Sequence, residues 1–178
     1  MASILALAAI STPACAQGGG GGLMPLSITV NSGLDFGAIA ADPSLAGTVT
    51  IDSVAGNKTV SNVTDLGGTH NRAELAISGD KNDGITISIT DPSSVGSLNL
   101  STMEHDCSLP CSIPGKGNFT LFIGRQVAVP GGTSAPSQTG SFDVTVDYTA
   151  NLGNDVTVSV GSSISVIQPI GVSESTTL

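Results

Sequence analysis

The stretch PLSITVNSGLDFG, Pro25 to Gly37, carries the strongest indication of the fold of this chain. Its first half alternates apolar and polar residues, as a β-strand with one buried face does. Asn31-Ser32-Gly33 then supplies residues that favour a turn. We therefore expect two strands, Leu26 to Val30 and Leu34 to Ile39, with a turn between them.

A shortened copy of this stretch, PIGVSESTTL, spans Pro169 to Leu178. The two segments align without a gap, although Val30 falls on Glu174. Because side chains of a strand alternate with a period of two, an in-register copy would bury the same positions. The apolar positions that could exchange between the two strands are Leu26, Ile28, Val30, Ile170 and Val172.

Three hypotheses account for the repeat, and the sequence leaves them open. In the first, the segment Ile164 to Ser173 occupies in a neighbouring copy the place of Leu26 to Val30, since an open sheet edge accepts an added strand. In the second, Leu178 is the point at which a tandem array was cut. In the third, both segments pair within one domain.

The composition is typical of an exported protein built of β-strands. Of 178 residues, 11% are charged, 3% are aromatic and none is Trp, while the mean hydropathy of +0.30 argues against disorder. The formal net charge of -9 and the five scattered basic residues argue against a nucleic-acid partner, because phosphate binding requires clustered Lys and Arg. It also disfavours binding to anionic lipid.

Residues 1–16 have the pattern of a secretion signal. An apolar run, Ile4 to Ile10, precedes the small residues Ala14-Cys15-Ala16, which predict cleavage before Gln17. The run is too short to span a bilayer as a helix, so we expect no membrane insertion after signal removal. No Lys or Arg precedes it, and an alternative is a lipoprotein signal acylated at Cys15.

A glycine-rich linker is expected over residues 17–24, because five glycines follow one another at Gly18 to Gly22. Beyond it, short alternating runs are separated by turn residues, and no 3.6-residue apolar period is present. The expected strands are Leu26 to Val30, Leu34 to Ile39, Thr48 to Asp52, Ala73 to Ser78, Ile85 to Thr90, Phe119 to Val129, Phe142 to Thr149, Val156 to Val160 and Ile164 to Ile167.

These strands predict an all-β, immunoglobulin-like antiparallel β-sandwich of seven to nine strands, with almost no helix outside the signal segment. We expect the sandwich domain to span residues 25–150. C-terminal strands would follow over residues 151–178, the last of them repeating the first strand of the domain.

Four motifs occur in an order that resembles a bacterial family of secreted β domains of unknown function, family 4402. They are PLSITVNSGLDFG, GTVTID at Gly47 to Asp52, AELAISG at Ala73 to Gly79 and GSFDVTVDY at Gly140 to Tyr148. The family is itself distantly similar to spore-coat-U and fimbrial subunits, which are immunoglobulin-like. The resemblance implies an exported sandwich and leaves the activity open.

Cys107 and Cys111 are the two cysteines that remain after signal removal, and in an exported chain we expect them to form a disulfide. The alternative is a metal site that adds His105 and Asp106, but the spacing is not that of a zinc site. The run Asp80 to Gly84 has some likeness to a calcium loop, yet a tight hairpin turn explains it better.

No nucleophile motif or pair of carboxylates supports a catalytic role, so we expect neither an enzyme nor a cofactor. The favoured function is an exported structural subunit of a cell-surface fibre, pilus-like filament or coat, with strand donation as one route of assembly. Its partners would be copies of itself or related subunits and a periplasmic chaperone, and its location the cell surface, reached through the periplasm. The alternatives are a surface binding module or adhesin for carbohydrate or protein and, more remotely, a hydrolase.

Overall fold

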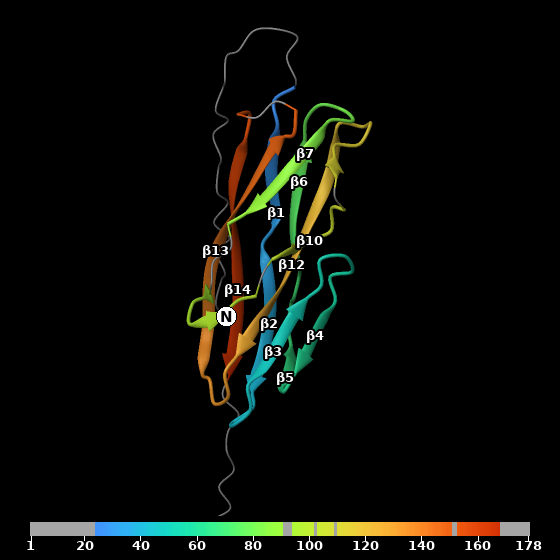
Figure 1. The fold of residues 1–178 in the computed structure, drawn as a ribbon. Helices are drawn as coiled ribbons and strands as arrows, with labels where there is room; N and C mark the ends of the chain where they lie inside the picture. Colours follow the sequence, from blue (N-terminus) through green and yellow to red (C-terminus); the bar gives the residue numbers. More distant parts are fainter. Residues whose placement is uncertain (1–23, 91–93, 102, 109, 151–152, 168–178) are drawn as a thin grey trace, which may run out of the picture.

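The computed structural model describes residues 24–90, 94–101, 103–108, 110–150 and 153–167, and within them the chain forms an elongated two-layer β-sandwich (Figure 1). The first sheet has the order β1 (Ser27–Ser32), β6 (Ala73–Ser78), β12 (Asn118–Val129), β3 (Gly47–Ile51), β4 (Lys58–Ser61), and β10 (Glu104–His105) also pairs with β12. The second has the order β11 (Cys111–Ser112), β7 (Gly84–Ile89), β13 (Ala135–Tyr148), β14 (Val156–Ile167), β2 (Leu34–Ala41), β5 (Val63–Gly67). A small ladder joins β8 (Ser94–Val95) to β9 (Leu98–Asn99).

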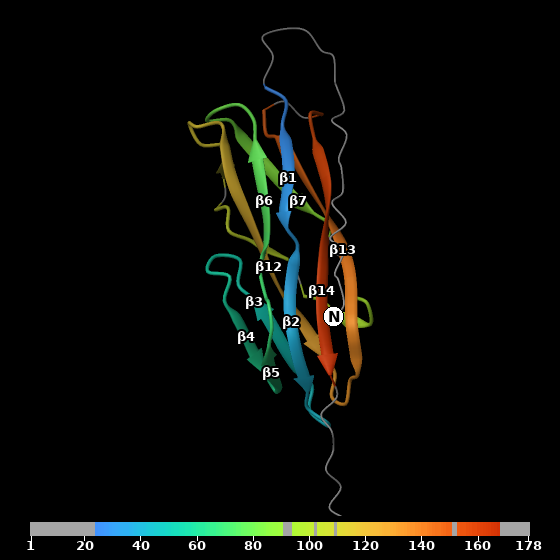
Figure 2. The ribbon, with the colours of Figure 1, turned by 180° about the vertical axis from the view of Figure 1, so that it is seen from behind.

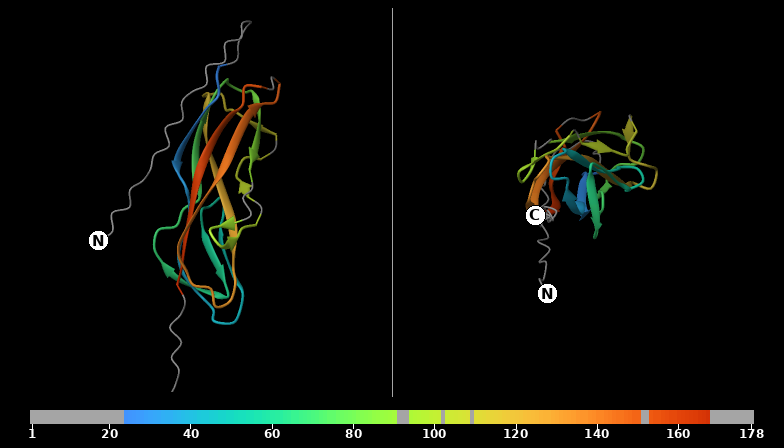
Figure 3. Two further views of the ribbon diagram at one scale, coloured as in Figure 1. Left: turned by 90° about the vertical axis from the view of Figure 1, so that its left-hand side faces the viewer. Right: turned by 90° about the horizontal axis from the view of Figure 1, so that it is seen from below.

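The alternating sequence pattern explains the layers. In β6, every second residue is buried, beginning at Ala73, and β14 shows the same alternation with Val160 and Val166 buried. Since neighbouring side chains of a strand point to opposite faces, each sheet turns one apolar face inward. The core therefore lies between the two sheets, whose arrangement is seen from the side and from below in Figure 3.

The connectivity is immunoglobulin-like. The first, second and fifth strands of that fold lie in one sheet and the third, sixth and seventh in the other. Here β1, β6 and β12 lie together, facing β7, β13 and β14. The strands β3, β4 and β5 are additional and come between β2 and β6 in the chain.

The predicted turn at Asn31-Ser32-Gly33 is wrong, because the chain does not reverse there. β1 pairs with β6 in the first sheet, and β2 continues in the same direction and pairs with β14 in the second. Gly33 is the crossing point: an ideal Cβ on it would lie 2.5 Å from the carbonyl oxygen of Gly161. A residue without a side chain is required where the two backbones touch.

The all-β sandwich is confirmed, and the described residues contain no helix. Three details differ from expectation. More strands are present than the predicted seven to nine, because β4 and β5 are exposed edge strands without an apolar period and β8 to β11 have two residues each. The two strands expected at Val156 to Val160 and Ile164 to Ile167 form one strand, β14. One pair, β14 with β2, is parallel.

The predicted hairpin turn at Asp80 to Gly84 is also wrong. β6 belongs to the first sheet and β7 to the second, so this segment connects the layers and does not join paired strands. Asn82 there has a positive φ of 65°, which is compatible with a tight connection. No helix in the described part of the chain has the length and apolar character needed to cross a membrane.

Candidate functional site

The candidate exchange residues Leu26, Ile28 and Val30 belong to the first strand and its immediate approach. Ile28 faces Ile77 of β6 in an antiparallel ladder that extends from Ser27 to Ser32. Leu26 and Ile28 are buried and Val30 is half-buried. The strand that the repeat would copy is therefore already paired within its own chain.

Tyr148 fixes the point at which the chain enters β1. Its hydroxyl donates to the carbonyl oxygen of Met24 at 2.7 Å and accepts from the backbone N–H of Asp80 at 2.6 Å. The ring is buried, and Gly79 leaves room for it, since a Cβ there would lie 2.4 Å from the hydroxyl. Burial raises the pKa of Tyr148 above its ordinary value of 10.0.

The sequence analysis missed this role of Tyr148. The available signal was the single tyrosine at the end of a strictly alternating strand, since the hydroxyl of a buried tyrosine usually has a hydrogen-bond partner.

One side of the sandwich has a stretch of unpaired sheet edge, beside β1. β14 pairs with β13 along nearly its whole length, but with β2 only from Ser162 onward. β1 lies beside the first half of β14 without pairing with it (Figure 2). We call the strip between β1 and residues Val156 to Gly161 the open seam. Within the described residues, no strand pairs with β14 along the seam, and Val30 and Val156 beside it are half-buried.

The other long side is closed by the predicted disulfide, which is present between Cys107 and Cys111. β10, just before it, belongs to the first sheet through β12, and β11, which begins at Cys111, belongs to the second through β7. The bond therefore fastens the short segment that crosses from one sheet to the other. On the β12 side, the backbone N–H of Asp106 donates to the carbonyl oxygen of Phe122 at 3.1 Å, and Oδ1 of Asp106 accepts from the backbone N–H of Phe122 at 2.8 Å.

Removing the disulfide should have a moderate effect, because it closes a loop of only five residues. The replacement of Cys107 and Cys111 together by serine should lower the free energy of unfolding by about 2 kcal/mol. Denaturant unfolding of the two proteins without reductant measures this difference. Complete unfolding of the variant at room temperature would contradict the prediction, since the hydrogen bonds of Asp106 and Ile113 hold the segment independently.

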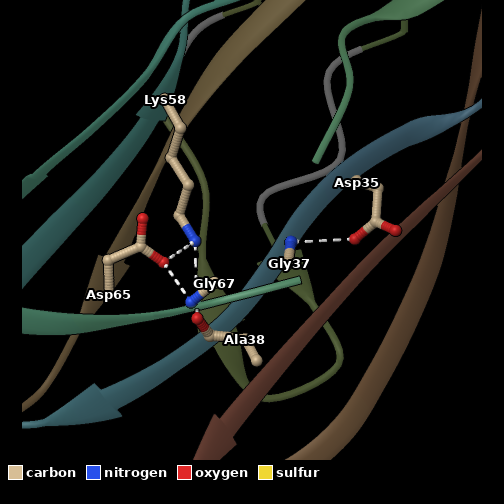
Figure 4. A network of polar contacts seen from close by, with 6 residues as sticks. All are labelled: Asp35, Gly37, Ala38, Lys58, Asp65 and Gly67. Atoms are coloured by element: carbon tan, nitrogen blue, oxygen red, sulfur yellow. Dashed lines mark hydrogen bonds and ion pairs between the residues drawn. The ribbon is translucent and has the colours of Figure 1, made fainter. Parts of the chain in front are cut away.

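Below the open seam, on the same side of the sandwich, an ion pair spans the two layers (Figure 4). The Nζ of Lys58 on edge strand β4 lies 2.6 Å from Oδ1 of Asp65 on edge strand β5, and 3.4 Å from the carbonyl oxygen of Ala38. The Lys58 side chain is 2% exposed and that of Asp65 42%. An inward-pointing charge on an edge strand disfavours the addition of a further strand there.

The pair should make stability depend on pH in the acid range. The hydrogen bonds from Lys58 and from the backbone N–H of Gly67 hold the pKa of Asp65 below its ordinary value of 3.8. A carboxylate with a depressed folded-state pKa stabilises the fold above its unfolded pKa, and loses this contribution as pH falls through the folded value. The contribution is small because Asp65 is partly exposed.

We therefore expect Asp65→Asn to lower the midpoint of thermal unfolding slightly near neutral pH, with the difference disappearing as pH falls below 3.8. Thermal unfolding of both proteins from neutral to acid pH tests this. In a Lys58→Met background the same substitution should have a smaller pH-dependent effect, because only the hydrogen bond from the backbone N–H of Gly67 remains. A difference that grows toward acid pH would contradict the assignment.

The remaining candidate residues do not converge on a chemical site. In the described part of the chain no three His, Cys, Asp or Glu side chains are placed to hold a metal ion. His105 lies opposite Ile123 on β12, and Asp80 lies at the Tyr148 contact. A surface hollow beside the end of β2 and the start of β5 is lined by Ala40, Ala41, Asp42, Pro43, Asn62, Val63 and Thr64.

The proposed donor segment Ile164 to Ser173 needs a correction in its first part. Ile164 to Ile167 is the end of β14 and pairs with β13 and β2, so these residues are not free to leave their own domain. Ile170 and Val172 lie outside the described residues, as do the signal segment and the glycine run.

Comparison with known proteins identifies the domain but no activity. No curated protein and no solved structure matches this chain. A family model described as "Domain of unknown function (DUF4402)" matches residues 26–148, from the first buried residue of the sandwich to Tyr148. The match covers more than half of the chain, and the protein therefore belongs to the DUF4402 family.

Proposed function

We propose that this protein is an exported structural subunit that stacks end to end in a cell-surface fibre, pilus-like filament or coat. The observation that carries the proposal is the parallel pairing of β14 with β2. Because β1 and β2 run in one direction and β14 runs with them, the sandwich begins at one end of its long axis and β14 ends at the other (Figures 1 and 3). A domain entered and left at opposite ends is suited to linear stacking.

Three further features support the proposal. The strands turn Ser, Thr and Asp outward, as in Asp143, Thr157 and Ser159, which suits an exposed subunit. The disulfide favours an oxidising compartment. The signal-like residues 1–16 favour export through the periplasm. The partners would be further copies or related subunits, with a periplasmic chaperone during export, and the proposal involves no catalysis and no cofactor.

The test is the assembly state of the exported chain. Light scattering over a range of protein concentrations, with negative-stain electron microscopy of the same samples, should show linear particles that lengthen with concentration. A monomer at every concentration would reject the proposal. A monomer that also binds an immobilised glycan would support a surface binding module instead.

A further inference from the structure

The open seam offers a place for one more strand. Beside the second half of β14, β2 provides a parallel partner from Ser162 onward. Beside the first half, Val156 to Gly161, the described residues provide none, because β1 has crossed to the other sheet. An added strand would therefore lie next to the first half of β14, in line with β2, which occupies the same edge of β14 from Ser162 onward. A sheet edge of this kind has backbone groups that can pair with an added strand.

The seam also differs from the other edges of the sandwich on this side. Asn62 joins the edge strands β4 and β5 in the chain, and the ion pair of Lys58 and Asp65 links these two strands across the layers. Among the described residues no comparable buried ion pair lies at the seam; Val30 and Val156 beside it are half-buried, and Val158 is buried. An apolar strip next to unpaired backbone is where strand addition is least opposed.

We propose that the seam binds residues Pro169 to Leu178 of a second copy of this chain as an added strand, parallel to β14. This inference rests on the proposed end-to-end stacking and names the contact that would hold it. It also changes the hypothesis taken from the repeat, because the added strand lies beside β1 and does not replace it.

Replacement of β1 is disfavoured by the contacts that β1 already makes. Releasing it would expose Leu26 and Ile28, both buried, and would break the bonds of Met24 to Tyr148 and Asp80. The incoming segment would restore less, since it has Glu174 where β1 has Val30. Addition at the seam requires none of these losses.

The direction of the chain fits the seam. β14 ends at Ile167, opposite Ala40, at the end of the molecule remote from the start of β1 (Figure 1). A segment that continues from Ile167 in the same direction enters the next stacked copy at the end where β1 begins, already parallel to that copy's β14. No reversal of the chain is needed.

The length and the pattern of the segment also fit. The eleven residues from Gln168 to Leu178, if extended, span about 36 Å, and the seam along Val156 to Gly161 needs about 20 Å. Ile170 and Val172 alternate with Gly171 and Ser173, so one face of the added strand would be apolar and the other polar. The contact joins two different surfaces and therefore propagates as a filament.

Mixed cysteine cross-linking tests the position of the added strand. In a Cys15→Ser background, a chain carrying Ser173→Cys is mixed with a chain carrying one second cysteine, and covalent dimers are counted after mild oxidation. We expect dimers with Thr157→Cys or Ser159→Cys, the exposed positions of β14 along the seam. The yield should be at least about tenfold that with the control Thr59→Cys on β4, because assembly holds the paired thiols at millimolar effective concentration.

The same experiment separates the rival arrangements. Thr29, which aligns with Ser173, lies opposite Ala76 on β6. Dimers formed with Ala76→Cys in place of the seam positions would show that the segment takes the place of β1, and would overturn the inference. Dimers with Thr59→Cys, or no dimers although particles form, would overturn it while leaving end-to-end stacking intact. A wild-type chain that stays monomeric would reject the proposed function itself.

A matched pair of charge substitutions gives an independent readout. Val172→Asp places a carboxylate on the apolar face of the added strand and should abolish growth of the light-scattering signal with concentration. Ser173→Asp adds the same charge on the polar face and should leave most of the growth. Because β14 ends at Ile167, before both positions, we expect thermal unfolding of each monomer to match the wild type. Equal assembly by both variants would count against the inference.

Discussion

Replacement of Gly33 by alanine should lower the free energy of unfolding by about 3 kcal/mol. A Cβ at this position would lie 2.5 Å from the carbonyl oxygen of Gly161 and 3.3 Å from its carbonyl carbon. Both atoms belong to backbone that pairs with β13, so neither can move without disturbing the centre of the second sheet. The two strands would have to separate where the parallel ladder of Ser162 and Leu34 begins.

Gly161 provides the control. It faces Gly33 across the same crossing, yet a Cβ built on it has no atom within 4 Å. Gly161→Ala should therefore be neutral or slightly stabilising, because alanine restricts the unfolded chain more than glycine does. Denaturant unfolding of the two variants separates a steric effect at Gly33 from a general intolerance of side chains at the crossing. Equal destabilisation by both would show that the close approach is not the cause.

The strands that the sequence predicts best are those with one buried face. In β6 and β7 the alternation of apolar and polar residues is local, so the residues themselves indicate both the strand and its inner face. The disulfide could be predicted for a similar reason, since Cys107 and Cys111 are close in sequence and remain as a pair after the signal segment.

Edge strands carry no such signal. β4 and β5 are exposed along most of their length, and the inward side chain of β4, Lys58, is charged because it meets Asp65 across the layers. The pattern of a buried face is therefore missing, although both segments form strands. Both segments form strands because they pair with β3 and β2, and the residues of β4 and β5 alone do not indicate these partners.

Two of the incorrect predictions fall beside glycines: the turn at Asn31-Ser32-Gly33, and the break between the strands that end at Val160 and begin at Ile164. Around Gly33 and Gly161 the sequence has the composition of turns, but the chain uses both residues where two backbones approach closely. Turn and crossing both require a small residue, so composition does not distinguish them. Whether the chain reverses at such a glycine depends on which strand pairs with the segment that follows it.

The candidate site could be predicted only in part. Leu26 and Ile28 were identified from the alternation of β1, and they are buried as expected of a sheet's inner face. The open seam could not be foreseen, because it results from β1 lying in one sheet and β14 in the other. Likewise, the hydroxyl of Tyr148 and the carbonyl of Met24 are 124 residues apart in sequence.

Tyr148→Phe should therefore reveal how firmly the beginning of β1 is held. The substitution keeps the ring but removes both hydrogen bonds of the hydroxyl, to Met24 and from Asp80. We expect a loss of about 2 kcal/mol in the free energy of unfolding, about 1 kcal/mol for each bond. Hydrogen exchange should increase most at the backbone of β1, since the rest of the ladder with β6 is unchanged.

The pH dependence gives the same contact a second readout. A group whose folded-state pKa is raised stabilises the fold below its unfolded pKa, and this contribution is lost as pH rises through the folded value. Burial raises the pKa of Tyr148 above 10.0, so the advantage of the wild type over Tyr148→Phe should shrink in strongly alkaline solution. Because the chain has one Tyr and no Trp, tyrosinate absorbance follows this ionisation directly. A titration midpoint at or below 10.0 would contradict the buried, hydrogen-bonded position.

A double-mutant cycle with Gly79 decides whether the hydroxyl itself occupies the space that this glycine leaves. A Cβ on Gly79 would lie 2.4 Å from the Tyr148 hydroxyl, 2.7 Å from Ile113 Cδ1 and 2.9 Å from Leu26 Cδ2. Gly79→Ala should destabilise the wild type strongly and the Tyr148→Phe background less, because the closest of the three contacts is gone. The coupling should not be complete, since the contacts with Ile113 and Leu26 remain. Strict additivity of the two substitutions would mean that the hydroxyl is not held against Gly79, and the proposed anchor of β1 would then be wrong.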